Sequence, residues 1–172
     1  MTVRWLDDEE LDTWLKFRAV VELFPSVVDG PLRRASGITF MEYQVLAMLS
    51  EPDDHTLQIS ALAQRTNSKL TRMSHLLTRL ADRGLIERQA STTDARVTYA
   101  HLTPDGLALL VKAAPGHVGQ VRDSFIDVLN REQLAQLGDI CDSILARIDP
   151  SGLVDARHAP AAAAAPAAPP AE

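Results

Sequence analysis

The chain has 172 residues, a formal net charge of −6 and a hydrophobic content of 46%, which suits one domain with one sizeable core. Its N-terminus MTVRWLDDEELDTW is acidic and amphipathic, whereas a secretory signal is basic and then apolar, and no apolar run approaches the roughly 18 residues needed to span a bilayer. We therefore expect a cytoplasmic protein with no membrane partner. Cys141 is the only cysteine, which excludes an intrachain disulfide and a cysteine cluster for a structural metal.

The N-terminal region is predicted to form two helices. Asp7 followed by Glu10 has the capping-box pattern that opens a helix, and the helical pattern continues to about Phe24. Pro25 lacks a backbone N–H and is expected to end that helix. A short second helix is expected over 27–35.

Two more helices are expected next. Thr39 and Glu42 cap a segment over 40–50 that is apolar on nearly every face, so this helix must be buried. The turn EPDDH and the short extended piece TLQI then lead to the helix ALAQRT, with Ser60 as its predicted cap.

A further helix and a hairpin follow. The helix over 69–83 comes after a turn at Asn67 and Ser68 and is closed by Gly84. The runs LIERQ and RVTYAHL have the composition of strands and flank the polar turn ASTTDA, which predicts a β-hairpin. The order helix, turn, helix, two-stranded hairpin is that of a winged helix-turn-helix.

The C-terminal part is predicted to be helical and then disordered. Thr103 and Pro104 start a long helix with a candidate kink at Pro115. Asn130 caps a final helix that reaches about Ile148. Residues 150–172 are rich in Ala and Pro, have little to bury, and are expected to form a disordered tail.

The charge is unevenly distributed along the chain. Between Ser60 and Thr103, seven Lys or Arg residues accompany three Asp or Glu residues, while the rest of the chain carries ten against twenty. An acidic body with one basic module suggests that the module contacts a polyanion, because phosphate attraction responds to the local patch. A solvated charged face is the alternative interpretation of the charge.

The helix over 69–83 has two faces of different chemistry. At 100° per residue, apolar side chains share one face, namely Leu70, Met73, Leu77 and Leu80. The opposite face carries cations and small donors, with no acid before Asp82: Ser68, Arg72, His75 and Arg79, with Thr71, Ser74 and Thr78 beside them. Such groups can enter a major groove and reach phosphates and base edges. The polar hairpin tip STTDAR is suited to a minor groove, and an ordinary solvated helix face remains the alternative.

Five elements in this region resemble the winged-helix region of MarR-type (multiple antibiotic resistance regulator) transcription factors. They are Leu62-Ala63, Thr71-Arg72, Arg79-Leu80 with Gly84-Leu85 and Arg88, Asp94-Ala95-Arg96, and Leu102-Thr103 with Gly106. The flanking helices match the layout of that family from about residue 7 to 148. The sequence departs from the pattern at Ala95, where a second wing arginine is common in the family.

The resemblance implies a mainly α fold with a small β-hairpin wing in a single domain over 1–149. The winged helix-turn-helix would span about 39–103, with dimerisation helices over about 7–35 and 104–148. It also implies a homodimeric, ligand-responsive regulator, expected to be a repressor, that binds an inverted repeat in double-stranded DNA. The expected DNA contacts are Ser68, Lys69, Thr71, Arg72, Ser74, His75, Arg79, Asp94 and Arg96.

Two other classes of function fit the sequence less well. A winged-helix interaction module that binds an acidic partner would use the same basic face. An enzyme is not expected, since the sequence has no nucleophile–base pair, phosphate-binding loop or paired carboxylates in a plausible pocket. The five histidines are scattered with no pair four residues apart, so no metal site and no cofactor are predicted.

The final helix carries an apolar stripe that suits a helix partner or the core of the same chain. Its members are Leu134, Leu137, Cys141, Ile144 and Ile148. Cys141 is interpreted as a small buried hydrophobe in preference to a redox switch.

A small effector would be expected between the dimer helices and the DNA-binding lobe, as the resemblance implies. The candidate contacts are Trp14, Arg18, Tyr43 and His117, which are aromatic side chains with polar tips and one cation. Core packing is the favoured interpretation for Trp14 and Tyr43. Arg18, on the largely apolar stretch WLKFRAVV, is the main candidate for an anion contact.

Overall fold

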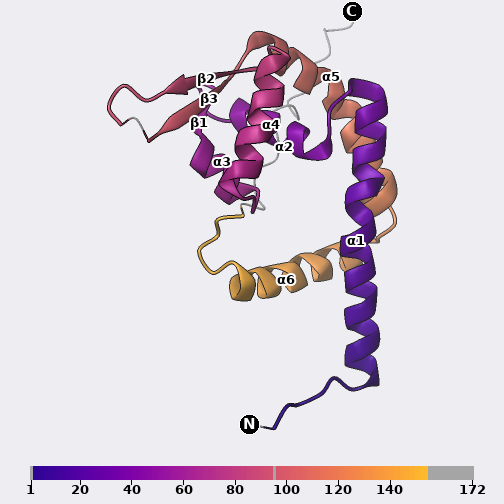
Figure 1. Cartoon of the computed structure of the whole chain (residues 1–172). Helices are drawn as coiled ribbons and strands as arrows, with labels where there is room; N and C mark the ends of the chain where they lie inside the picture. Colours follow the sequence, from indigo (N-terminus) through magenta and orange to yellow (C-terminus); the bar gives the residue numbers. More distant parts are fainter. Residues whose placement is uncertain (1, 95, 155–172) are drawn as a thin grey trace, which may run out of the picture.

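The computed structural model describes residues 2–94 and 96–154, and Figure 1 shows a lobe beside long helices. The lobe holds α2, α3, α4 and three strands. Its elements are α2 (Phe40–Ser50), β1 (Thr56–Gln58), α3 (Ile59–Arg65), α4 (Leu70–Asp82), β2 (Ile86–Ala90) and β3 (Thr98–Leu102). The long helices are α1 (Asp8–Ser36), α5 (Pro104–Val121) and α6 (Arg131–Ile148), with a π-helical turn, η1 (Arg122–Ile126), after α5.

A single helix, α1, occupies the region predicted to hold two. The capping box of Asp7 and Glu10 is present, but the helix runs through Pro25 instead of ending there. An interior proline costs about 3 kcal/mol because it removes one hydrogen bond and crowds the preceding turn. Here α1 packs along α5, and the Phe24 ring lies 5.6 Å from that of Phe125. Such tertiary packing decides helix formation more than propensity does.

The sheet of the lobe has the antiparallel order β1-β3-β2, so the predicted hairpin of β2 and β3 is confirmed. The extended piece TLQI becomes a third strand, in which Leu57 pairs with Ala100. The predicted cap at Ser60 is wrong, because α3 begins at Ile59, directly after the strand, with no side-chain cap bond. Ile59 is buried at this junction.

The core of the lobe is built around α2 and one face of α4. The Thr39–Glu42 capping box is confirmed, and α2 is buried along most of its length. Three of the four apolar α4 residues predicted to face inward are buried, as is Leu76, whereas Leu70 is 56% exposed. Leu70 is the first residue of α4 and borders a surface hollow in place of the core.

Helix α5 starts from the lobe at the predicted cap, Thr103. A Cβ atom on Gly106 would lie 2.1 Å from the backbone oxygen of Leu85, so only glycine allows α5 to approach the lobe this closely. The helix continues through Pro115, and the departure from α-helical geometry comes at Arg122–Ile126.

Helix α6 has the predicted capping box of Asn130 and Gln133, yet it buries no residue. Cys141 is exposed, so its predicted burial is wrong within the described part of the chain, where no helix or strand covers this stretch of α6. After α6, the Asp149 carboxylate accepts hydrogen bonds from the N–H groups of Leu153 and Val154, forming a turn. Residues 155–172 of the predicted tail lie outside the described residues.

Candidate nucleic-acid interface

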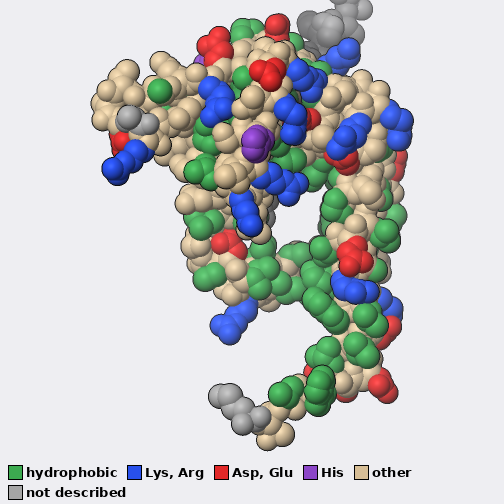
Figure 2. All heavy atoms as spheres, in the orientation of Figure 1, with side chains coloured by type: hydrophobic (Ala, Val, Ile, Leu, Met, Phe, Trp, Pro, Cys, Tyr) green, Lys and Arg blue, Asp and Glu red, His purple; other side chains and the backbone are tan. Residues whose placement is uncertain are grey.

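The polar face of α4 is open to solvent, because burial of Met73, Leu77 and Leu80 fixes the opposite face inward. Figure 2 shows Lys and Arg side chains gathered over α4. Of the α4-region residues predicted to contact DNA, five are exposed and two, Ser68 and Ser74, are partly buried. The exposed ones are Lys69, Thr71, Arg72, His75 and Arg79.

The arginines of this face differ in their contacts. Arg72 makes no hydrogen bond or ion pair with any described residue. The Arg79 guanidinium lies 3.4 Å from the carboxylate of Glu42. Arg72 is therefore the freer of the two to contact a ligand.

Arg88 on β2 was not predicted as a site residue, although it belongs to the motif that carries the resemblance. Its guanidinium donates hydrogen bonds to the hydroxyls of Thr78, at 3.0 Å, and Ser74, at 3.3 Å. Arg88 thereby links the wing to α4 and adds positive charge beside the polar face. The sequence does not show that β2 lies beside α4, so the contact of Arg88 with α4 follows only from the fold.

The wing tip is shaped by its own side chains. The Ser91 hydroxyl accepts from the N–H groups of Thr93 and Asp94, and the Asp94 carboxylate accepts from the N–H of Arg96 at 2.9 Å. Asp94 thus orders the turn, while the exposed Arg96 guanidinium has no partner among the described residues. Ala95, where the sequence departs from the family pattern, lies outside the described residues.

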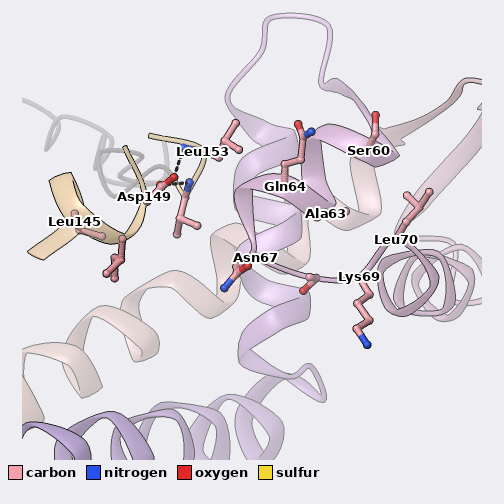
Figure 3. A pocket seen from close by; sticks show the side chains of 12 residues that line it. Ser60, Ala63, Gln64, Asn67, Lys69, Leu70, Leu145, Asp149 and Leu153 are labelled. Carbon is pink, nitrogen blue, oxygen red and sulfur yellow. Dashed lines mark hydrogen bonds between the residues drawn. The ribbon is translucent and has the colours of Figure 1, made fainter. Parts of the chain in front are cut away.

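A hollow of about 810 Å³ lies between the α3–α4 turn and the end of α6. Figure 3 shows it bordered by Asn67 and Leu70 on one side and by the Asp149 turn on the other, with the Lys69 amine pointing away from that turn. A hollow therefore separates the N-terminal end of α4 from the end of α6 and the turn at 149–154.

Two of the four ligand candidates, Tyr43 and His117, lie together where α2 meets α5. Their ring centroids are 4.4 Å apart, and Phe40 stacks on His117 at 5.5 Å. The Tyr43 hydroxyl and His117 Nδ1 are buried with no hydrogen-bond partner among the described residues. Burial raises the pKa of Tyr43 and lowers the pKa of His117. Core packing is confirmed for Tyr43, which is 2% exposed.

The other two candidates, Trp14 and Arg18, lie elsewhere. The Phe24–Phe125 contact fixes how α1 runs beside α5, and at 1.5 Å per residue Arg18 is roughly 20 Å along the helices from His117. Core packing is wrong for Trp14, which is 51% exposed and borders a hollow with Phe17 and Ile144. One chain therefore does not bring the four candidates into one site.

Two kinds of feature are absent from residues 2–94 and 96–154. No cluster of three or more His, Cys, Asp or Glu side chains there could hold a metal ion. None of the helices in this part of the chain is long and apolar enough to cross a membrane.

The chain is similar to proteins that control transcription. A family model described as the MarR family matches residues 36–97. A DNA-bound MarR family regulator of Streptomyces coelicolor, Sco3205, superposes with a TM-score of 0.83 at 32% identity, covering 87% of this chain and 94% of that one. The chain belongs to the MarR family.

Two Bacillus subtilis relatives of this MarR family chain have names that state a role. The HTH-type transcriptional regulator MhqR is 30% identical over 65% of this chain and 72% of its own length. The HTH-type transcriptional repressor YetL is 29% identical over 63% of this chain and 66% of its own length. The MarR family chain described here is thus a regulator of transcription with a winged-helix fold, and not an enzyme.

Proposed function

We propose that this MarR family regulator is a cytoplasmic repressor that binds an inverted repeat in double-stranded DNA as a homodimer and releases it when a small effector binds. The observation that carries the proposal is the exposed polar face of α4, on which cations and hydroxyls lie opposite the buried side chains of Met73, Leu77 and Leu80. The DNA complex of Sco3205 and the repressor name of YetL support it. Residues 1–149 would act as one domain.

Helix α4 would read bases and the wing would hold the backbone. Arg72 and His75 on α4 are exposed and would reach base edges in the major groove, while Lys69, Thr71 and the two serines position the helix on phosphates. Arg96 would enter the neighbouring minor groove, where negative potential attracts guanidinium groups. Asp94 would contribute by ordering the wing turn.

The dimer would form through the apolar side chains that α1 and α6 leave exposed. Figure 2 shows hydrophobic side chains along both helices, and the exposed ones include Trp14, Phe17 and Ile144. Large contiguous apolar patches on a protein surface mark interaction sites. A second copy offers the same surface, which is the requirement of a two-fold interface.

An effector would bind at Tyr43 and His117, whose buried polar atoms have no hydrogen-bond partner in the part of the chain that the structure describes. Unsatisfied buried donors and acceptors cost about 1–3 kcal/mol each, so a ligand that pairs with both gains that energy. The site lies between the long helices and the lobe, where a ligand would alter the spacing of two recognition helices. Trp14 and Arg18 would act at the dimer face, and an anionic effector reaching that face would meet Arg18.

Selection from a random duplex library tests the DNA-binding proposal. The expected product is an inverted repeat with half-site centres about 10 base pairs apart, and an affinity that falls steeply with salt. Enrichment of no sequence, with equal affinity for all duplexes, would contradict the proposal and favour an acidic protein partner.

A further inference from the structure

Two arginines one helical turn apart connect the end of α4 to the joint between α1 and α2, which contains Gly37 at the end of α1 and Glu42 in the first turn of α2. Arg79 pairs with Glu42 at 3.4 Å, and Arg83 donates a hydrogen bond to the carbonyl of Gly37 at 3.2 Å. Gly37 ends α1 in a left-handed conformation, with φ of 66°. The C-terminal half of α4 is therefore attached to the end of α1, whereas no such tie holds Arg72 in its N-terminal half.

Glu42 is at the centre of this joint. Its side chain is 6% exposed, and one carboxylate oxygen accepts the N–H of Thr39 at 2.8 Å as part of the α2 cap. The other oxygen faces Arg79. A buried carboxylate needs both a hydrogen-bond donor and an opposite charge, and among the described residues Arg79 is the cation that supplies the charge.

A third contact joins α1 itself to the same point. One oxygen of the Asp29 carboxylate accepts the N–H of Phe40, the first residue of α2, at 2.8 Å, and the other pairs with Arg33. Phe40 in turn stacks on His117 of α5. Polar contacts thus connect α4, through the junction of α1 and α2, to the helix that runs out of the lobe.

We infer that Arg79 is a positioning residue for DNA recognition, which sets the orientation of α4 through Glu42, and not a phosphate or base contact. The inference rests on the proposed function, since it assumes that α4 enters the major groove. It assigns Arg79 a role different from that of Arg72, although both lie on the same exposed face. Misorientation of α4 should weaken binding to the correct sequence, where base contacts require accurate geometry, and leave non-specific binding unchanged.

A double-mutant cycle with Glu42→Gln and Arg79→Ala tests this inference, using the duplex selected by the unmodified protein and a scrambled duplex of the same length. Each single change is expected to lower affinity for the selected duplex about 3- to 10-fold, and the double change to lower it no further. Affinity for the scrambled duplex and the salt slope should stay unchanged. Arg79→Lys should restore part of the loss because it keeps the charge.

Arg72→Ala is the matched control. It should reduce the salt slope or the sequence preference. In the double variant, the fold-losses of affinity caused by Arg72→Ala and by Glu42→Gln should multiply, because the two residues share no bond. Arg83→Ala should follow the pattern of Arg79→Ala, since it acts on the same joint. Thermal unfolding of each variant separates a loss of binding from a loss of folded protein.

A different set of affinities would contradict the inference. If Arg79→Ala weakens binding to both duplexes and lowers the salt slope by about one unit per half-site, while Glu42→Gln raises affinity by removing a competing negative charge, Arg79 is a DNA contact and the inference is wrong. If the unmodified protein selects no duplex, the proposed function itself fails, which is a different outcome.

Discussion

The lobe buries its apolar side chains, whereas α1 and α6 leave most of theirs exposed. In the lobe, Ile38, Leu46 and Leu77 are fully buried within one core cluster. On α1, only Val28 and Leu32 are buried, and α6 buries nothing. The lobe has a core of its own, whereas most apolar side chains of α1 and α6 are left exposed by the residues that the structure describes. The difference is what the proposed dimer would explain, since a second copy would cover the exposed side chains of α1 and α6, whereas the lobe has its own core.

The largest effect is expected from a charge placed on the unpartnered stripe. Ile144→Asp would bury a carboxylate between apolar side chains of two subunits, so the dimer dissociation constant should rise about 100-fold or more. Sedimentation velocity measures the change. Ala146→Asp, which lies on the opposite side of α6, is the control and should leave the dimer intact. Equal behaviour of the two variants would remove α6 from the interface.

The contact between α5 and the lobe is expected to be weakened by substitution of one glycine, Gly106. Gly106→Ala would place a methyl group against the Leu85 backbone, which cannot move aside cheaply, and should lower the free energy of unfolding by about 2 kcal/mol. Gly116→Ala, also within α5, meets open space and should raise it by about 0.5–1 kcal/mol. Denaturant unfolding measures both. A stable Gly106→Ala protein would mean that α5 approaches the lobe less closely.

Within the lobe, helix and wing should contribute differently to DNA binding. Arg72→Ala should relax the sequence preference at one half-site position by about 1–3 kcal/mol, because it would remove a base contact. Arg96→Ala should weaken binding to all sequences and lower the salt slope by about one unit per wing. Titrations at several salt concentrations measure both quantities. An unchanged slope and affinity for Arg96→Ala would exclude the wing from the interface.

The smallest effect concerns His117, at the boundary between the two regions. Burial holds its pKa below the ordinary 6.5, so the unfolded chain binds more protons than the folded one as the pH falls through that range. The histidine therefore lowers stability on acidification and has no such effect well above its unfolded pKa. His117→Phe should lose less stability between about pH 7.5 and pH 5.5 than the unmodified protein. Thermal unfolding with equal acid sensitivity in both proteins would contradict this.

Local patterns in the sequence predicted the helix caps and the hairpin well. The Thr39–Glu42 and Asn130–Gln133 capping boxes and the hairpin depend on residues close in sequence, and all are present in the structure. The break at Pro25 was predicted wrongly because packing of α1 on α5 overrides a local signal. Strand pairing of Leu57 was not predicted, since it joins segments more than forty residues apart.

The candidate site was predictable in composition but not in contacts. The polar face of α4 followed from helical spacing, yet the ties from Arg79 to Glu42 and from Arg88 to Ser74 connect different elements. The exposure of Trp14 could not be foreseen either. An apolar stripe has the same pattern whether its partner is the core of the chain or a second chain.

The central claim is that a two-fold dimer, formed by the stripes of α1 and α6, presents two α4 helices to one face of DNA. Inserting about five base pairs between the half-sites of the selected duplex rotates one half-site by half a helical turn. Measured by equilibrium titration, affinity for this spaced duplex should fall about 100-fold or more, toward the non-specific level. An affinity within a few-fold of the original would contradict the dimeric major-groove account.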